Sequence, residues 1–377
     1  MAGIAAAITC ARRGLRSVLI EKSFGLGGLA TRGLINWLEP YCDGAGQRVL
    51  GGVAWEVFQL AVNCGYQTLS ADWREGIPKA NGPRLASWFS PERFMLEVEA
   101  WLVEAGVHLL YDTWAVQPVM NGSRCEGLLL ECKEGRRFLP AGTVIDASGD
   151  AEICCKAGMP CECGENYLTM TVYLASTASA QAAAVQNQPY LVRERSRFGA
   201  NMHGVNHPEG EPLTVGTMAE ELTAYTIRSH RLMLEKLKGN QEVLSLPQMP
   251  QLRTIRHMVG DAVFLGTEDH VNCVSSIGVI PDYMQRGSLF ELPFGCLYNR
   301  KFDNLLAAGR IISCKGRGWH VSRVIGPVLL TGQAAAEAAA LLVSCRQTVQ
   351  TLEASVVQQR LAQTGVAIHI GQLGKQA

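Results

Sequence analysis

The chain lacks an excess of charge of either sign, because 34 lysines and arginines balance 34 aspartates and glutamates. This balance excludes the strong positive field that draws proteins to nucleic acid or to anionic membranes. Apolar runs of the ~18 residues needed to span a bilayer are also missing, since Gly, Ser or a charge interrupts each candidate. A secretory signal is excluded because Arg12, Arg13 and Arg16 follow the apolar start instead of preceding it. We predict a soluble, cytoplasmic protein that binds a small molecule and neither nucleic acid nor membrane; the sequence leaves its oligomeric state open.

Paired CxxC motifs are likewise missing, although the chain contains 13 cysteines. The cysteines are scattered and odd in number, which favours reduced thiols in the cytosol. One cluster, CCKAGMPCECG, holds Cys154, Cys155, Cys161 and Cys163. Its spacing fits neither zinc nor ferredoxin patterns. We predict no metal, and a metal at this cluster remains the minor alternative.

The N-terminal segment has the pattern of half a dinucleotide-binding βαβ unit. Gly3 begins a helix of small residues, Gly14 ends it, and Ser17 to Ile20 form a short apolar strand that leads to Glu21. An acidic residue about 20 positions after the glycines binds the adenosine ribose in such folds. The first strand and most of the phosphate turn are not encoded, and we therefore expect poor solubility and weak cofactor binding. The alternative for this segment is an alanine-rich core helix followed by an ordinary strand.

The whole chain has 377 residues, which is long enough for two domains or for one large domain with an insertion. Ser90-Pro91-Glu92 predicts a capped helix to about Ala105. Three strand-like runs follow, joined by hairpin turns at Asn121-Gly122 and Glu134-Gly135. Residues 159–251 are polar and irregular with one helix predicted over 217–237, and we expect an inserted substrate-side domain there. A strand at 304–308 and a helix of small residues at 332–342 then return to the core.

Four of these segments, taken in order, resemble the FAD-dependent oxidoreductases of the glutathione-reductase-like superfamily, particularly the fumarate-reductase-type branch. The resemblance is carried by the N-terminal unit, by Gly27-Gly28-Leu29-Ala30-Thr31, by Ala147-Ser148-Gly149-Asp150, and by Asn304 to Arg310 with Thr331 to Ala335. It implies an α/β fold: a Rossmann-like FAD-binding domain of three layers, with a mostly parallel sheet plus a β-meander, an inserted α+β substrate domain, and a missing first strand. It implies FAD as the cofactor.

The resemblance also assigns domains and cofactor contacts. It implies a first part of the FAD domain at 1–158, an inserted substrate or cap domain at 159–251, a return segment at 252–346 and a C-terminal helix and tail at 347–377. Residues expected to bind FAD share small size or a position beside the glycines: Gly3, Glu21, Lys22, Gly27, Gly28, Leu29, Ala30, Thr31, Ala147, Gly149, Asp150, Gly309 and Arg310. Glycines allow amide donors to reach phosphate, and a helix N-terminus favours the anion.

Catalytic candidates must lie near the flavin and supply charge or protons. Arg323 is a candidate clamp for a carboxylate or for a reduced flavin, His320 a proton relay, and Arg256 a second cation. Each has a structural alternative: an ion pair with a local acid for the arginines, and capping or packing for His320. Many relatives carry Thr-His where this chain has Lys315-Gly316, so the usual histidine of the family is absent.

The leading hypothesis is an FAD-dependent oxidoreductase that transfers hydride between the flavin and a small organic substrate. A truncated, catalytically silent remnant with weak or no FAD binding is the alternative. A flavoprotein acting on tRNA is disfavoured by the neutral charge. The sequence identifies neither the substrate nor the electron acceptor, and a separate NAD site is doubtful because no second complete glycine fingerprint is present.

Overall fold

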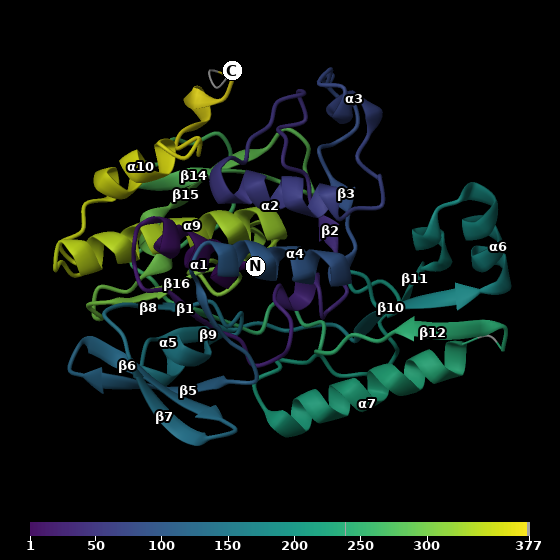
Figure 1. The fold of residues 1–377 in the computed structure, drawn as a ribbon, viewed down its shortest axis with the longest axis horizontal. Helices are drawn as coiled ribbons and strands as arrows, with labels where there is room; N and C mark the ends of the chain where they lie inside the picture. The colour runs from purple at the N-terminus through teal and green to yellow at the C-terminus, as the bar shows by residue number, and fades with distance from the viewer. Residues whose placement is uncertain (238, 375–377) are drawn as a thin grey trace. The chain divides into compact units, whose positions relative to one another are not determined.

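The computed structural model describes residues 1–237 and 239–374, which form a mixed α/β protein (Figure 1). The chain divides into two compact units. The first contains Met1–Gly27, Trp37–Glu162 and His257–Ala377, and the second contains Gly28–Asn36 and Cys163–Arg256. Strands β9 (Cys161–Cys163) and β13 (Arg256–Met258) lie at the boundaries between these segments.

Helix α9 (Ile325–Ser344) forms the centre of the first unit and runs beside α1 (Ala2–Arg12) (Figure 1). A Cβ added at Gly332 would overlap the carbonyl of Ala2, so the two helices touch along their backbones. Alanines at 334–336 and 338–340 are buried, which allows neighbours to pack closely. The further helices of this unit are α2 (Gly52–Asn63), α3 (Ala71–Arg74), α4 (Pro91–Glu104), α5 (Glu152–Lys156), α8 (Arg317–Ser322) and α10 (Ala354–Ala362).

Helix α9 corrects the expectation that no apolar segment is long enough to cross a membrane. By length and composition it is, but 94% of its most apolar stretch is buried inside the protein. Gly332 and Gln333 do not interrupt the helix, because Gly332 packs against Ala2 and the Gln333 side chain accepts the N–H of Val53. Burial on this scale is typical of a core helix in a folded protein.

Parallel pairing occurs at two places in the first unit. Strand β1 (Val18–Ile20) pairs with β4 (His108–Leu110), and β16 (Leu305–Ala307) pairs with β8 (Val144–Asp146). Among the described residues these pairs form separate two-stranded sheets. The α/β class is as expected, while the mostly parallel sheet of three layers stays a prediction, because each of these short strands pairs with one neighbour. The predicted absence of a first strand stays a prediction.

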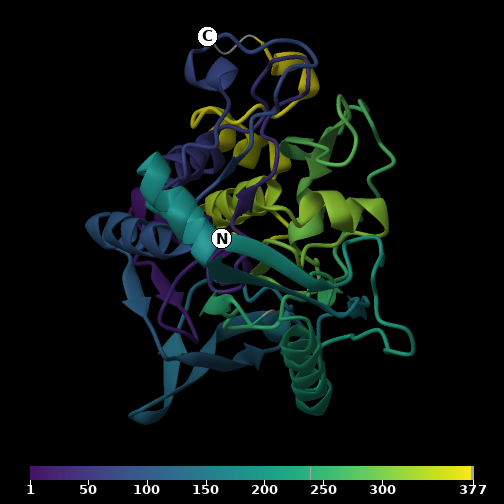
Figure 2. The ribbon, with the colours of Figure 1, turned by 90° about the vertical axis from the view of Figure 1, so that its right-hand side faces the viewer.

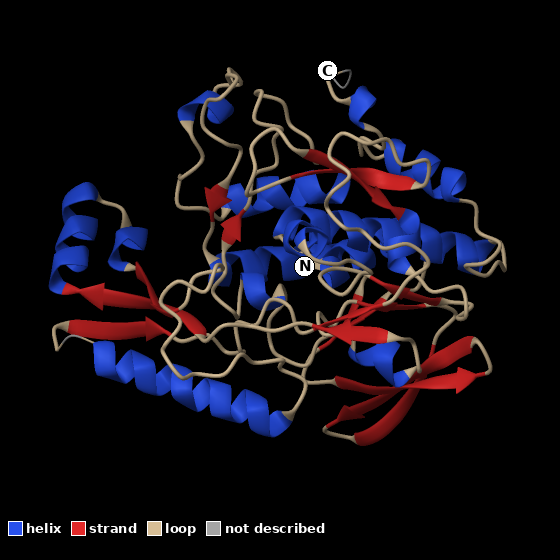
Figure 3. Cartoon of the chain, turned by 180° about the vertical axis from the view of Figure 1, so that it is seen from behind, coloured by secondary structure: helices blue, strands red, loops and turns tan. Residues whose placement is uncertain are grey.

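Antiparallel pairs make up the rest of this unit. The expected meander is β5 (Trp114–Asn121), β6 (Arg124–Cys132) and β7 (Gly135–Pro140), with hairpins at the predicted turns (Figure 3). The first and third predicted runs are each divided, because β4 and β8 belong to the parallel pairs instead. The remaining pairs are β2 (Trp37–Leu38) with β3 (Ser87–Trp88) and β14 (Ser276–Pro281) with β15 (Leu289–Pro293).

The second unit is a three-stranded antiparallel sheet with a long helix on one face (Figure 2). Its strands β10 (Thr169–Ser176), β11 (Glu194–Gly199) and β12 (Gln241–Ser245) are ordered β11-β10-β12, with α6 (Thr177–Gln186) following β10. Helix α7 (Ala219–Lys236) contributes Met233 to a core with Met170, Val172, Leu174 and Phe198. The segment Gly28–Asn36 joins this unit through hydrogen bonds from the side chains of Tyr173 to Asn36 and Gln251 to Gly33.

Candidate functional site

The N-terminus of α1 meets the carboxyl ends of short parallel strands. A Cβ at Gly3 would lie 3.1 Å from Leu19 Cδ1 and 3.5 Å from Ala147 Cβ, so only a small residue permits this approach. Gly309, at φ +90°, follows β16 and would bring a Cβ to 3.1 Å from Ala2 Cβ. No side chain in the described chain caps α1, which leaves its first N–H groups for a ligand.

Charged groups surround this helix terminus. Burial lowers the pKa of the Met1 amino group to about 6, while Glu21 raises that pKa and Arg310 lowers it further. Both side chains therefore act at the start of α1. Ser23 donates to Glu21 Oε1 from its backbone N–H at 3.0 Å and from its hydroxyl at 2.6 Å, which fixes the carboxylate at the end of β1.

Arg310 and Lys22 both have partners inside the first unit. Arg310 donates from Nε to the Gly149 carbonyl and from a terminal nitrogen to Asp150 at 2.6 Å, so it ties the β16 turn to the β8 turn. Lys22 lies 3.9 Å from Glu152 and 5.2 Å from the centre of the Trp114 ring. Both cations thus contact neighbouring side chains or carbonyls in this structure, and their roles toward FAD stay predictions.

The glycine-rich segment adopts a tight turn. Gly27 and Gly28 have φ of 102° and 55°, values that favour glycine. A 3₁₀ turn over Gly28–Ala30 includes Leu29, and Thr31 donates its N–H to the Gly28 carbonyl at 3.1 Å. Gly27 belongs to the first unit and Gly28 to Thr31 to the second. Arg256 also belongs to the second unit, where it begins β13.

Of the other two catalytic candidates, His320 lies in helix α8 and Arg323 is the residue that ends it. Trp319 donates from Nε1 to the Arg310 carbonyl at 2.7 Å, which connects α8 to the β16 turn. Burial lowers the pKa of Arg323; Tyr283 and Glu39 raise that pKa, and Arg310 lowers it. In the described chain the buried Nε of Arg323 has no hydrogen-bond partner.

A turn after β14 completes this region and was missed by sequence reasoning. Tyr283 accepts a hydrogen bond from Arg323 through its hydroxyl, at 3.4 Å. Arg84 donates to the carbonyls of Asp282 and Tyr283 at 2.7 and 2.8 Å, and Arg317 binds the Asp282 carboxylate. No sequence signal joined these residues, because Arg84 is 198 positions from Asp282.

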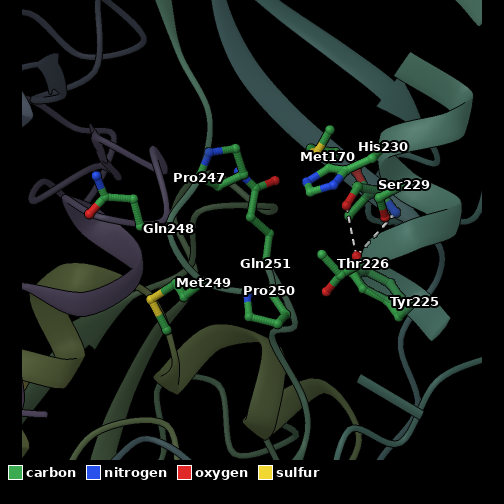
Figure 4. A pocket seen from close by; sticks show the side chains of 11 residues that line it. Met170, Tyr225, Thr226, Ser229, His230, Pro247, Gln248, Met249, Pro250 and Gln251 are labelled. Atoms are coloured by element: carbon green, nitrogen blue, oxygen red, sulfur yellow. Dashed lines mark hydrogen bonds between the residues drawn. The ribbon is translucent and has the colours of Figure 1, made fainter. Parts of the chain in front are cut away.

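The second unit contains a hollow of about 310 Å³ between α7 and the start of β10 (Figure 4). Two of its polar side chains hydrogen-bond to the backbone of the same unit: the Tyr225 hydroxyl exchanges hydrogen bonds with Thr169, and the Gln251 amide bonds to Thr171 and Gly33. The lining residues are Thr169, Met170, Tyr225, Thr226, Ser229, His230, Pro247, Gln248, Met249, Pro250 and Gln251.

The four cysteines of the cluster are thiols in this structure. Cys154 is fully buried, and burial raises its pKa well above the ordinary value. Its N–H donates to Asp146, which anchors the start of α5. Across residues 1–237 and 239–374, no group of three or more His, Cys, Asp or Glu side chains could hold a metal ion.

The family model "FAD dependent oxidoreductase" matches residues 1–199 and 277–361, well over half of the chain. The chain belongs to this family. The cofactor of the family is FAD, so the recognition from sequence and the cofactor prediction are confirmed. No curated protein matches the chain.

Solved structures similar to this FAD-dependent oxidoreductase include flavoproteins with low identity. CabE, an aromatic hydroxylase from angucycline biosynthesis, is 12% identical, with 97% of this chain and 64% of that chain covered at a TM-score of 0.45. A geranylgeranyl bacteriochlorophyll reductase-like protein from Thermoplasma acidophilum is 12% identical, with 96% and 80% covered at 0.44. A flavoprotein/dehydrogenase from Cytophaga hutchinsonii is 14% identical, with 96% and 80% covered at 0.45. The chain thus spans 64% of the hydroxylase, and similarity this weak says nothing about its substrate.

The residues around α1 fit the adenosine diphosphate part of FAD. The uncapped helix N-terminus suits a pyrophosphate, the ordered Glu21 carboxylate suits ribose hydroxyls, and Gly3 and Gly309 keep the backbone uncovered. Gly3, Ala147 and Gly309 lie close to the start of α1, and the roles of the predicted residues toward FAD stay predictions. Gly28 to Thr31 are described only within the second unit.

Proposed function

We propose that the chain is an oxidoreductase in which FAD bound on the first unit exchanges hydride with a small organic substrate. The observation that carries this proposal is the uncapped N-terminus of α1 beside the ends of β1, β8 and β16. Arg323 ends α8, and Trp319 of that helix donates to the Arg310 carbonyl in the β16 turn. When bound, FAD supplies the redox chemistry. The protein residues bind it, orient the substrate and supply charge and protons.

Each residue of the proposed site has a distinct task. The first N–H groups of α1 hold the pyrophosphate, and Glu21 accepts hydrogen bonds from the ribose. Gly3, Gly27, Ala147, Gly149 and Gly309 give backbone access, with Lys22, Asp150 and Arg310 along the cofactor. Arg323 places a positive charge beside the reacting groups, and His320, three residues earlier in α8, relays a proton. Arg256 is proposed as the cation of the second unit.

Purification of the full chain with added FAD tests the cofactor site. We expect flavin absorbance bands that stay with the protein during gel filtration. A Gly3→Val variant should weaken FAD binding by at least about tenfold, because its side chain would displace α1 from Leu19 and Ala147. A chain that folds, shown by circular dichroism, and yet binds no flavin would refute the proposal.

Arg323→Gln tests the role of the cation at the end of α8. We expect FAD to bind as in the wild type. Reduction of the bound flavin by organic donor substrates, measured without dithionite, should slow by about tenfold or more, because one oriented charge contributes several kcal/mol to such sites. Arg300→Gln is the control, because Arg300 is exposed and pairs with Asp261 on the surface. Equal rates in the two variants would remove Arg323 from the reaction.

A further inference from the structure

A buried hydroxyl group lines the hollow of the second unit. Ser229 lies on α7, is 3% exposed, and contributes to the wall of the hollow. Within the described chain its Oγ is buried and has no hydrogen-bond partner. A buried polar group without a partner costs free energy, and a bound molecule that reaches it recovers that cost. The hollow therefore contains both space and an unused polar group.

The neighbouring phenol of Tyr225 is already engaged with the backbone. Its hydroxyl donates to the Thr169 carbonyl at 2.7 Å and accepts the Thr169 N–H at 3.2 Å. Burial raises the pKa of Tyr225, while Thr169, Arg253 and Ser229 lower it. Ser229 thus acts on the phenol without forming a hydrogen bond to it. An incoming group can pair with Ser229 without breaking a bond of the fold.

The wall across from Ser229 offers a ligand mainly apolar surface. Figure 4 shows Ser229 on α7 at one side of the hollow and the segment from Pro247 to Gln251 at the other. The Gln251 amide donates to backbone carbonyls of its own unit. Pro247 and Pro250 have no N–H group to donate. A molecule in the hollow is therefore held by packing on this side and by a hydrogen bond on the other.

The lining also indicates the charge and the size of the ligand. None of the lining residues, all of which the structure describes, is Asp, Glu, Lys or Arg. The nearby Arg253 donates to the Gln251 carbonyl at 3.0 Å and does not line the hollow. A charged ligand would lose its hydration without gaining a counter-charge. The volume of about 310 Å³ exceeds the ~150 Å³ cavity that holds benzene in another protein.

We propose that this hollow binds a neutral one-ring compound with a single hydroxyl group, of which phenol is the simplest. The ligand hydroxyl pairs with Ser229 Oγ, and its ring packs against the Met170 thioether and the two prolines. His230, next to Ser229 on α7, borders the same space and is partly exposed. Every lining residue belongs to the second unit, so this site goes beyond the proposed function and does not depend on FAD.

Fluorine NMR of three matched probes on the full chain tests the site. The probes are 4-fluorophenol, 4-fluorotoluene, in which a methyl group replaces the hydroxyl, and the anion 4-fluorobenzoate. We expect 4-fluorophenol to bind and 4-fluorobenzoate to bind at least about tenfold more weakly, because the hollow supplies no cation. Absence of 4-fluorophenol binding, or tighter binding of the benzoate, would overturn the assignment.

Ser229→Ala tests the hydrogen bond to the ligand. The ratio of phenol to toluene affinity should fall by about tenfold in this variant, since one hydrogen bond is lost and the apolar packing stays. The melting temperature should not fall, because the variant removes a hydroxyl that has no partner in the fold. An unchanged affinity ratio would refute the site. A lowered melting temperature would show that Ser229 serves the fold instead.

Thr226→Leu and Thr223→Leu form a matched pair that tests the space itself. Both threonines lie on α7 and donate to the carbonyl four residues earlier, at 2.8 Å, but only Thr226 lines this hollow. Thr226→Leu should weaken phenol and toluene binding alike by filling the hollow, and Thr223→Leu should change neither. Equal effects of the two variants would contradict the location.

Measurements with and without FAD separate this inference from the proposed function. Binding of 4-fluorophenol that persists without FAD and depends on Ser229 supports the site even if the chain binds no flavin. Binding that requires FAD and is unchanged in Ser229→Ala places the probe at the flavin, and the inference is then wrong.

Discussion

At the scale of single residues, burial shifts the pKa of a titratable side chain and so makes stability depend on pH. His257 is buried, and its Nδ1 shares a hydrogen bond of 3.0 Å with the Met258 carbonyl. Burial lowers the pKa of His257 below its ordinary 6.5, the Met258 carbonyl and Glu162 raise that pKa, and Lys315 lowers it. The folded state therefore favours the neutral imidazole.

This shift predicts a pH dependence of stability. Below pH about 6.5 the unfolded chain binds a proton at His257 that the folded chain resists, so the free energy of unfolding falls as the pH decreases through that range. Urea denaturation of the wild type and of His257→Asn at pH 7.5 and 5.5 measures the effect. We expect a smaller decrease for the variant, and identical decreases would contradict the explanation.

Glu337 is the second residue whose burial has a measurable consequence. Its carboxylate, 1% exposed, binds Arg13 through two hydrogen bonds of 2.8 Å and lies 3.9 Å from Arg360. Glu337→Gln should lower the free energy of unfolding by about 1.5–3 kcal/mol, since the buried carboxylate loses the charge that strengthens its two hydrogen bonds with Arg13. Glu56→Gln is the matched control on the exposed Arg12–Glu56 pair, with an expected change below about 1 kcal/mol. Both are read from urea midpoints, and similar losses would contradict the prediction.

At the scale of elements, glycine positions control how closely helices approach. Gly332 of α9 faces the Ala2 carbonyl of α1. Gly332→Ala should therefore lower the free energy of unfolding by about 1–3 kcal/mol through overpacking. Gly371→Ala is the control, because nothing lies within 4 Å of a Cβ at that glycine and its φ is not positive. A thermal melt that shows no difference between the two variants would refute this contact.

Elements defined by contacts between residues close in sequence were predicted, whereas those defined by contacts far apart in sequence were not. Ser90 was predicted as a cap because its bond to the N–H of Arg93 is local, and the turn at Asn121 is equally local. The membership of Gly28–Asn36 in the second unit was not predictable, since it depends on bonds such as Tyr173 to Asn36, 137 positions apart, and Gln251 to Gly33, 218 positions apart.

The candidate site shows the same division. Gly3, Glu21 and Gly149 were identified because a sequence motif marks them, and the structure gathers them with Arg310. Tyr283 and Arg84 carry no motif, and only folding brings them to Arg323. Arginine is identified from sequence as a cation, but whether it has a partner depends on the whole fold.

At the scale of the whole molecule, the cysteines differ in how far their thiols are exposed to solvent. All 13 cysteines are thiols, and of these Cys163 and Cys345 are exposed. Burial raises the pKa of Cys64 to about 11 and those of Cys10 and Cys314 to about 12. The reactive species is the thiolate, so these three should react slowly in the folded chain.

Titration with a disulfide reagent such as DTNB tests this pattern. We expect a fast phase from Cys163 and Cys345 in the folded chain and reaction of all thiols after unfolding in guanidinium. The double variant Cys163→Ser, Cys345→Ser should lose the fast phase and keep the same thermal stability. A fast phase that persists in this variant would contradict the burial pattern.

The alanines of α9 have a further consequence for conformational entropy and for sequence variation. Alanine loses no rotamer freedom when it is buried, so the helix enters the core at little entropic cost. The same small side chains leave no alternative packing for a larger residue. In a library of random variants selected for folding, positions 334–336 and 338–340 should therefore be among the least tolerant of the chain, although each carries one of the simplest side chains.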